Sequence, residues 1–307
     1  MNREEKILDS IELQKGEFIP PNGSKSASFV IEDNYNDRLF DFLVDRFGIV
    51  DKALFRKKFD QAISGDGNEA KKMTSVRSSS LCALLFFYNV ENKPVTFDID
   101  GQKIKFDKSY FEVKNKVFNK PSNMDVVLVS ERNEHILFLE SKFAEYLDNS
   151  AIEISNTYLD NKLSKEIYKE AIDNKLIDKI NGKYKTTKDY QYVGGLKQII
   201  SHYVGLQNYK NREDSYMRSY YSDDDSRLKV YDKAKWNIYF TEIVFKLKDF
   251  ETQYERYHLG SMKLFEILRK EDKDIKYLDP IDYNSLFSNK NNIECISDKI
   301  KAYYKIK

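Results

Sequence analysis

The sequence predicts an α/β or α+β domain, because its patterns run in the order helices, strands, helix, strand, helix. Apolar residues recur at helical spacing before residue 64 and after residue 190. Apolar runs bounded by turn residues lie between residues 95 and 143. Of the 307 residues, 41% are hydrophobic and 14% are aromatic, so the chain can form a substantial core that a disordered chain could not.

The predicted helices follow apolar positions three and four residues apart. Gly48 is expected to divide the first pattern into two helices, and Gly194-Gly195 to begin the helix before residue 210. The predicted helical segments are 36–63, 69–90, 164–180, 193–209, 254–271 and a short helix within 275–287.

The predicted strands are short apolar segments separated by turn residues. Asp100-Gly101 is a typical two-residue hairpin turn and should join the two halves of segment 95–106. The other predicted strands are 109–118, 125–131, 136–143 and at least one within 227–247.

The charge balance is close to neutral, with 51 basic and 50 acidic side chains and a formal net charge of +1. This argues against a protein held to nucleic acid by bulk charge, although it allows a local basic cleft. Two lysine groups could contribute to such a cleft, but each is expected to be a solvated face. They are Lys114, Lys116 and Lys120, and Lys183, Lys185 and Lys188.

The two cysteines, Cys82 and Cys295, form no CxxC pair, and only three histidines are present, so a zinc site is not expected. Cys82 lies in the run LCALLFFY and is expected to be a buried thiol. The charged start MNREEKILDS lacks the apolar core of a signal peptide, and no apolar run approaches the roughly 20 residues of a membrane helix. We therefore expect a cytoplasmic protein.

The stretch PSNMDVVLVSERNEHILFLESKF, residues 121–143, carries the chemistry. Side chains alternate along a strand, so Glu140 and Lys142 share one face, roughly 6.6 Å apart along the backbone. If Asp125 lies on the paired strand, two carboxylates and one ammonium converge at one edge of the sheet. Mg²⁺ prefers such oxygens, and a lysine beside them can position or deprotonate an attacking water. This set predicts metal-assisted phosphodiester hydrolysis.

The bare pattern Glu-x-Lys is common in this chain and is usually a solvated strand face. It also occurs at residues 69–71, 91–93 and 112–114, and Glu112 and Lys114 follow a hairpin that carries carboxylates. Only Glu140 and Lys142 end a strongly apolar strand that a tight turn joins to another apolar strand opening with Asp125. Charges in a covered sheet are costly and tend to be functional, which favours residues 140–142.

Asp125 followed by Glu140-Ser141-Lys142 resembles the PD-(D/E)xK nuclease superfamily, with PSNMD where that family often has Pro-Asp. An upstream helix supplies Glu69 and a downstream helix supplies Gln198, in the family's order. The resemblance implies an α/β, restriction-endonuclease-like fold with a central mixed β-sheet flanked by helices. It also implies an N-terminal helical extension over residues 1–64 and a nuclease-like domain over residues 65–307, which form one compact unit.

More narrowly, SSSLCALLF, ESKFAE and LKQIISHYVGL resemble a bacterial group of restriction-endonuclease-like proteins. Three positions depart from that group: Ser80 stands for Gln, Ala144 for a hydroxyl residue and Ser201 for Arg. The last change leaves one cation fewer for a phosphate backbone.

The resemblance implies a Mg²⁺-dependent endonuclease that hydrolyses DNA in restriction, defence or repair, with Mn²⁺ expected to substitute. Asp125, Glu140 and the main-chain oxygen of Ser141 would hold the metal, assisted by Glu69. Lys142 would act on the water, and Gln198 would support the site. Two-strand cutting would suit a homodimer. The alternatives are an RNA-directed nuclease and a catalytically inactive nucleic-acid-binding protein with the same fold.

Several nearby residues have two interpretations. His202 is four residues after Gln198, hence on the same helical face, and a solvated polar stripe is the favoured interpretation. Glu145 could join the site or be a surface charge, and we favour the site. Asp223, Asp224 and Asp225 are expected to be a solvated loop rather than a metal site.

Overall fold

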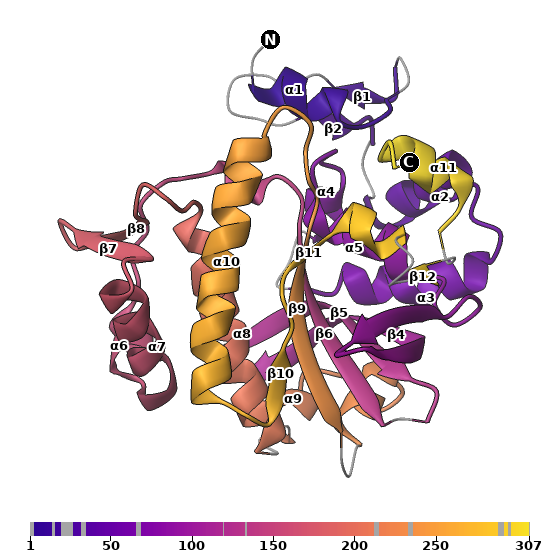
Figure 1. Cartoon of the computed structure of the whole chain (residues 1–307). Helices are drawn as coiled ribbons and strands as arrows, with labels where there is room; N and C mark the ends of the chain where they lie inside the picture. Colours follow the sequence, from indigo (N-terminus) through magenta and orange to yellow (C-terminus); the bar gives the residue numbers. More distant parts are fainter. Residues whose placement is uncertain are drawn as a thin grey trace.

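The computed structural model describes residues 3–13, 16–19, 27–31, 35–65, 69–118, 120–132, 134–211, 215–232, 236–287, 292–293 and 296–306. Within these residues an eight-stranded mixed sheet forms the centre of the molecule, in the order β10-β9-β6-β5-β4-β3-β12, with β11 also paired to β9 (Figure 1). Its strands are β3 (Val95–Ile99), β4 (Gln102–Lys116), β5 (Pro121–Ser130), β6 (His135–Lys142), β9 (Asn237–Val244), β10 (Ile275–Tyr277), β11 (Ile281–Asp282) and β12 (Asn292–Ile293). The predicted mixed sheet flanked by helices is confirmed.

The sheet is antiparallel from β3 to β6 and parallel where β9 joins β6 and β10. The β3–β4 hairpin turns at Asp100 and Gly101, whose φ angles of 54° and 80° are those of a type I′ turn, as predicted. The segment 109–118 is not a separate strand, because β4 runs on from Gln102 through a register shift between Phe106 and Lys108. That irregularity lets one long strand bend without ending.

Helices cover both faces of the sheet. Figure 1 shows α8 and α10 together on one side, and α5 with the N-terminal helices and α11 on the other. The helices are α1 (Arg3–Asp9), α2 (Tyr35–Phe47), α3 (Lys52–Ala62), α4 (Glu69–Met73), α5 (Ser79–Phe87), α6 (Asn156–Asp160), α7 (Lys162–Asp173), α8 (Val193–Lys210), α9 (Ser215–Arg218), α10 (Glu251–Glu271) and α11 (Asp298–Tyr303). Short 3₁₀ turns are η1 (Glu145–Leu147), η2 (Ser226–Tyr231) and η3 (Tyr283–Phe287), and two small hairpins are β1 (Phe18–Ile19) with β2 (Ser28–Phe29) and β7 (Ile177–Ile180) with β8 (Lys183–Thr186).

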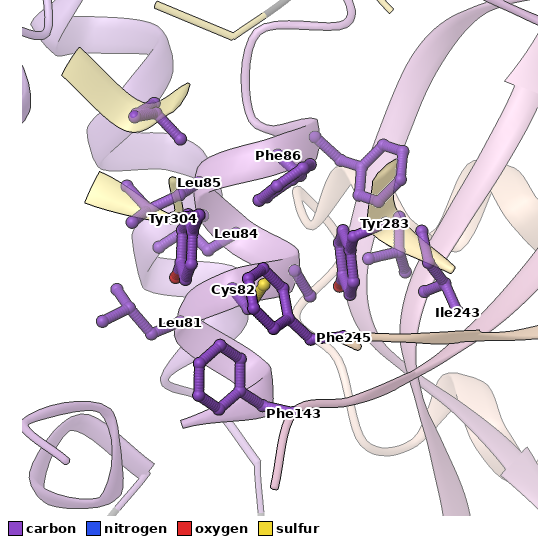
Figure 2. Packing of buried hydrophobic residues seen from close by; sticks show 14 of the residues in the cluster. Leu81, Cys82, Leu84, Leu85, Phe86, Phe143, Ile243, Phe245, Tyr283 and Tyr304 are labelled. Atoms are coloured by element: carbon purple, nitrogen blue, oxygen red, sulfur yellow. The ribbon is translucent and has the colours of Figure 1, made fainter. Parts of the chain in front are cut away.

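Each face of the sheet has its own apolar core. One core joins α8 and α10 to residues such as Phe138 and Phe240. The other joins the N-terminal helices, α5 and α11, so Phe55 of α3 shares a core with the sheet. Figure 2 shows the centre of this second core, where Cys82 lies among aromatic rings that include Tyr283 and Tyr304. Cys82 is a buried free thiol, as predicted, whereas Cys295 lies outside the described residues.

The predicted helix over residues 69–90 is wrong in its continuity. It divides into α4 and α5, and the intervening segment pairs instead with β2, through Phe29 N to Thr74 O at 2.8 Å and Val76 N to Ala27 O at 3.1 Å. Ser78 then begins α5 by accepting a hydrogen bond from Leu81 N, which satisfies one of the free donors at the new helix start.

The predicted helix over residues 164–180 is also too long. Helix α7 ends at Asp173, and Lys175 takes a left-handed φ of 54°, after which β7 pairs with β8. The break predicted at Gly48 is confirmed, with φ at 63° between α2 and α3. No helix in the described part of the chain is long and apolar enough to cross a membrane.

Candidate active site

Four neighbouring strands carry an acidic residue at the same level of the sheet. Phe111 pairs with Val126 and Val113 with Met124, which brackets Glu112 opposite Asp125. The pairing of β5 with β6 then continues from Val126 and Leu139 toward Asp125 and Glu140. Glu140 pairs directly with Glu242 on β9. The row therefore runs Glu112, Asp125, Glu140, Glu242.

Glu140 and Lys142 point to the same face of β6, as the alternation predicts. Lys142 Nζ donates to Glu140 Oε1, and each residue is only 3% exposed. Ser141 points to the opposite face, where its hydroxyl donates to Ser79 O at 3.0 Å and lies 2.7 Å from the Tyr283 hydroxyl. The charged pair is thus inside the molecule, beneath α8 and α10.

His202 of α8 completes the surroundings of Glu140. Its Nε2 lies 2.8 Å from Glu140 Oε2, and its Nδ1 lies 2.5 Å from the Ser122 hydroxyl. The favoured interpretation of His202 as part of a solvated stripe is wrong. His202 shares the buried stripe of Ile199 and Leu206, three and four residues away, and this apolar spacing was the better signal.

Ser122, His202 and Glu140 form a hydroxyl–imidazole–carboxylate chain. Such a chain can activate a serine nucleophile when the hydroxyl faces a substrate site. Here Ser122 is a buried strand residue, 7% exposed, and Glu140 is shared with Lys142. We therefore interpret these three side chains as a hydrogen-bonded set through which His202 of α8 fixes the orientation of Glu140.

The pKa values of the two candidate metal ligands, Asp125 and Glu140, are shifted in opposite directions. Burial raises the pKa of Asp125, and the charges of Glu140 and Glu112 raise it further, whereas Lys142 opposes them. Burial would also raise the pKa of Glu140, but Lys142 and His202 outweigh it and lower that pKa to about 2. Burial lowers the pKa of Lys142, yet the Glu140 charge prevails and raises it. Glu140 and Lys142 are a stable ion pair, whereas Asp125 bears the repulsion.

Asp125 is the more accessible of these two carboxylates, since it is half-buried. Its Oδ2 accepts a hydrogen bond of 2.7 Å from Ser141 N. This contact joins the end of β6 to the middle of β5. The prediction that this strand opens with Asp125 is wrong, because β5 already begins at Pro121, where residues 121–124 pair with β4.

The backbone is irregular at this level. Glu112 has a φ of 50°, a left-handed conformation that costs a non-glycine residue about 1 kcal/mol or more. Phe111 and Val113 belong to opposite cores although they are two residues apart, and so do Val126 and Met124. The backbone strain at Glu112 is of a kind that often marks a functional site.

The side chains of Glu69 and Glu112 both lie next to Gly65. A side chain at Gly65 would meet both, since its Cβ would lie 2.7 Å from Glu69 Cγ and 3.1 Å from Glu112 Oε2. Glu69 also forms a 2.5 Å ion pair with Lys72 of α4. A Cβ at residue 65 would force the Glu69 side chain to shift, so glycine here allows Glu69 to lie this close to the acidic row.

The remaining predicted residues lie at the margin. Gln198 is exposed on α8, one turn before His202. Glu145 caps the end of β6, because its Oε2 accepts hydrogen bonds from Phe143 N at 2.7 Å and Ala144 N at 2.9 Å. The roles assigned to Gln198, Glu145 and the main-chain oxygen of Ser141 stay predictions.

Glu242 belongs to this acidic row although no motif in the sequence predicts it as a site residue. It is fully buried, it accepts a 2.6 Å hydrogen bond from the Tyr257 hydroxyl, and burial raises its pKa to about 7. The signal was present, because a lone carboxylate in the apolar strand NIYFTEIVF resembles the one in ILFLESKF.

The lysine groups and the acidic loop considered in the sequence differ in exposure and contacts in the structure. Lys114 is buried, with its Nζ 4.9 Å from the centre of the Tyr220 ring, so the interpretation of this residue as a solvated face is wrong. Lys183, Lys185 and Lys188 are exposed, as expected. In the acidic loop, Asp225 forms a 2.6 Å ion pair with Arg227, which gives it a structural role.

The donor set suits a hard divalent cation. Asp125 and Glu140 offer carboxylate oxygens, and Mg²⁺ commonly uses one or two carboxylates together with waters and phosphate oxygens. Among the described residues, no three Asp, Glu, His or Cys side chains converge as a complete set of ligands. Because both Glu140 oxygens already have partners, Asp125 would be the first ligand met from outside.

No family model, no curated protein and no solved structure matches this chain. The fold and the site define it as a mixed-sheet α/β protein with a row of four carboxylates, one of which is held by a lysine and a histidine.

Proposed function

We propose that this protein is a metal-dependent phosphodiester hydrolase that acts on nucleic acid. The observation that carries the proposal is geometric: Glu112, Asp125 and Glu140 lie on neighbouring strands at one level of the sheet, with Lys142 paired to Glu140. In this row the charges of Glu140 and Glu112, together with burial, raise the pKa of Asp125. A cluster that penalises its own negative charge is stabilised by a divalent cation. Lys142 at the same level supplies a positive charge that can face a phosphate.

In this proposal Asp125 and Glu140 hold Mg²⁺, assisted by the main-chain oxygen of Ser141 and by Glu69. When bound, the cation would polarise the phosphate and lower the pKa of a water ligand. His202 keeps Glu140 turned toward the site through the 2.8 Å contact. The charge of Glu140 raises the pKa of Lys142, which supports the first of its two suggested roles, the positioning of water. A lysine that keeps its proton positions water and offsets phosphate charge, and it does not act as the base.

Cleavage assays test the proposal. Supercoiled, linear and single-stranded DNA and single-stranded RNA would be incubated with the protein and Mg²⁺ or Mn²⁺, and with EDTA as a blank. We expect metal-dependent cutting that is lost in Lys142→Ala and Asp125→Asn and retained in Lys93→Ala, an exposed lysine outside the candidate site and the two lysine groups. If the wild type cuts none of these substrates better than Lys142→Ala does, the protein is not a hydrolase of this kind.

A non-catalytic nucleic-acid-binding protein is the second candidate. It is favoured by the 3% exposure of Glu140 and Lys142, which already satisfy one another. Calorimetric titration with Mn²⁺ separates the two. Binding that disappears in Asp125→Asn supports the hydrolase, whereas no binding even with DNA present supports the second candidate.

The choice between DNA and RNA rests on the same assay, because the carboxylates and Lys142 face phosphate rather than sugar. Cutting of both strands of a duplex would favour a homodimer, in which a twofold axis presents two sites to antiparallel strands. Sedimentation with and without duplex DNA would detect it.

A further inference from the structure

A pocket of about 410 Å³ lies beside the candidate active site. Ala144, Glu145 and Asp148, which follow the Lys142 strand, form part of its wall. Residues of α1 and of the α4–α5 segment, and Tyr192 before α8, form the rest. In Figure 1, α1 lies at the same end of the molecule as α4. The volume is within the range of small-ligand sites, so the pocket can hold a molecule about as large as one nucleotide.

Three cations line this pocket: Arg3, Lys72 and Arg77. The two acidic lining residues are already engaged by neutral donors. Glu145 accepts from two main-chain N–H groups, and Asp148 accepts from Ser150 N at 3.0 Å and the Ser150 hydroxyl at 2.6 Å. Two of the cations are engaged by carboxylates, Lys72 by Glu69 at 2.5 Å and Arg77 by Glu4 at 2.6 Å, so an anion in the pocket would compete with these partners.

Arg77 contacts only one of the two carboxylate oxygens of its partner, Glu4, in the contacts described. Its Nη1 donates to Glu4 Oε1 of α1 at 2.6 Å, while the buried Glu4 Oε2 has no hydrogen-bond partner among the described residues. A guanidinium presents a fork that suits two oxygens of one phosphate. Glu4 therefore occupies the position of an anion at Arg77 with one contact where a phosphate could make two.

Tyr192 gives the pocket an aromatic wall. It has a left-handed φ of 62° at the start of α8, and its ring lies over Gly194 and Gly195, where added Cβ atoms would approach ring atoms to 3.0 and 2.7 Å. Because Gly194 and Gly195 have no Cβ atoms, the Tyr192 ring can lie in this position. An aromatic ring fixed at the wall of a basic pocket is a surface on which a base can stack.

We infer that this pocket binds one phosphate-bearing nucleotide unit, with its phosphate at Arg77 and Lys72 and its base against Tyr192, and that Glu4 competes for Arg77. Helix α1 is then a displaceable cover. The binding of a nucleotide unit does not depend on the proposed function. If the proposed function holds, this unit would be part of the nucleic-acid strand that reaches Lys142.

Calorimetry in EDTA with adenosine 5′-monophosphate, adenosine and inorganic phosphate tests the inference on the full chain. We expect the monophosphate to bind more tightly than either fragment. Arg77→Gln should weaken it about tenfold or more, Arg77→Lys should weaken it less, and Glu4→Gln should tighten it. Tyr192→Leu should weaken the monophosphate but not inorganic phosphate. Arg56→Gln is the matched control, since Arg56 pairs with Asp37 and Asp60 outside the pocket.

Circular dichroism would confirm that each variant is folded. Equal monophosphate affinity in the wild type, Arg77→Gln and Arg77→Lys would overturn the inference, as would no binding to the wild type and to Glu4→Gln. A dinucleotide joined by one phosphodiester distinguishes an internal phosphate from a terminal one. Monophosphate binding without nucleic-acid cleavage would support the nucleotide pocket and contradict the proposed hydrolase. Metal-dependent cleavage without monophosphate binding would support the hydrolase and contradict the nucleotide pocket.

Discussion

His202 Nε2 on helix α8 lies 2.8 Å from Glu140 Oε2 on strand β6, and both side chains are nearly inaccessible to solvent. Lys142 holds the other oxygen of the same carboxylate. Glu140 is thus oriented from its own strand and from the helix that covers it, which links the docking of α8 to the geometry of the candidate site.

Substitution of His202 should loosen this arrangement. His202→Ala leaves Glu140 Oε2 buried without its donor, and we expect a loss of about 1–3 kcal/mol in the free energy of unfolding. Ser122→Ala removes only the contact at Nδ1 and should cost less. Urea denaturation measures both, and equal losses in the two variants would show that the Glu140 contact contributes nothing.

Lys142 should be essential to stability as well as to the proposed chemistry. Lys142→Met leaves Glu140 as an uncompensated buried charge, which typically costs about 3–5 kcal/mol. Adding Glu140→Gln removes that charge and should recover part of the loss, as a double-mutant cycle by urea denaturation would measure. A double variant no more stable than Lys142→Met would contradict a direct pair.

Glu242 should make stability fall with rising pH. Its pKa is raised from 4.5 to about 7 by burial, so between these values the folded protein keeps a proton that the unfolded chain has lost. Stability therefore falls from about pH 4.5 to pH 7 by on the order of 3 kcal/mol and is constant with respect to this group above that range. Unfolding midpoints at a series of pH values should show this slope in the wild type and a flatter profile in Glu242→Gln. An unchanged slope would exclude Glu242 as its source.

The strained residue Glu112 offers a backbone test. Glycine adopts its φ of 50° without penalty, whereas alanine does not, and both remove the carboxylate. We expect Glu112→Gly to be more stable than Glu112→Ala by about 1 kcal/mol. Thermal unfolding compares the two, and a more stable alanine variant would mean that the strand relaxes to an ordinary conformation.

Much of the local structure followed from short-range patterns. Asp100-Gly101 specified a hairpin because few residue pairs accept positive φ at both positions, and β6 placed Glu140 and Lys142 on one face through strand alternation. The single helix predicted over residues 69–90 was wrong because backbone groups near Thr74 pair with residues 27–29, a contact between distant segments.

The sequence by itself determined the mixed α/β class, the strand that carries Glu140 and Lys142, and the presence of Asp125 on its partner strand, since these depend on periodicity and turn chemistry within a few residues. Only the tertiary structure decided that His202 and Glu242 belong to the same buried cluster and that Glu69 reaches Glu112 across Gly65. These contacts depend on the register of β6 against β9 and on how α8 and α4 dock, which arise from burial of apolar surface between segments far apart in the chain.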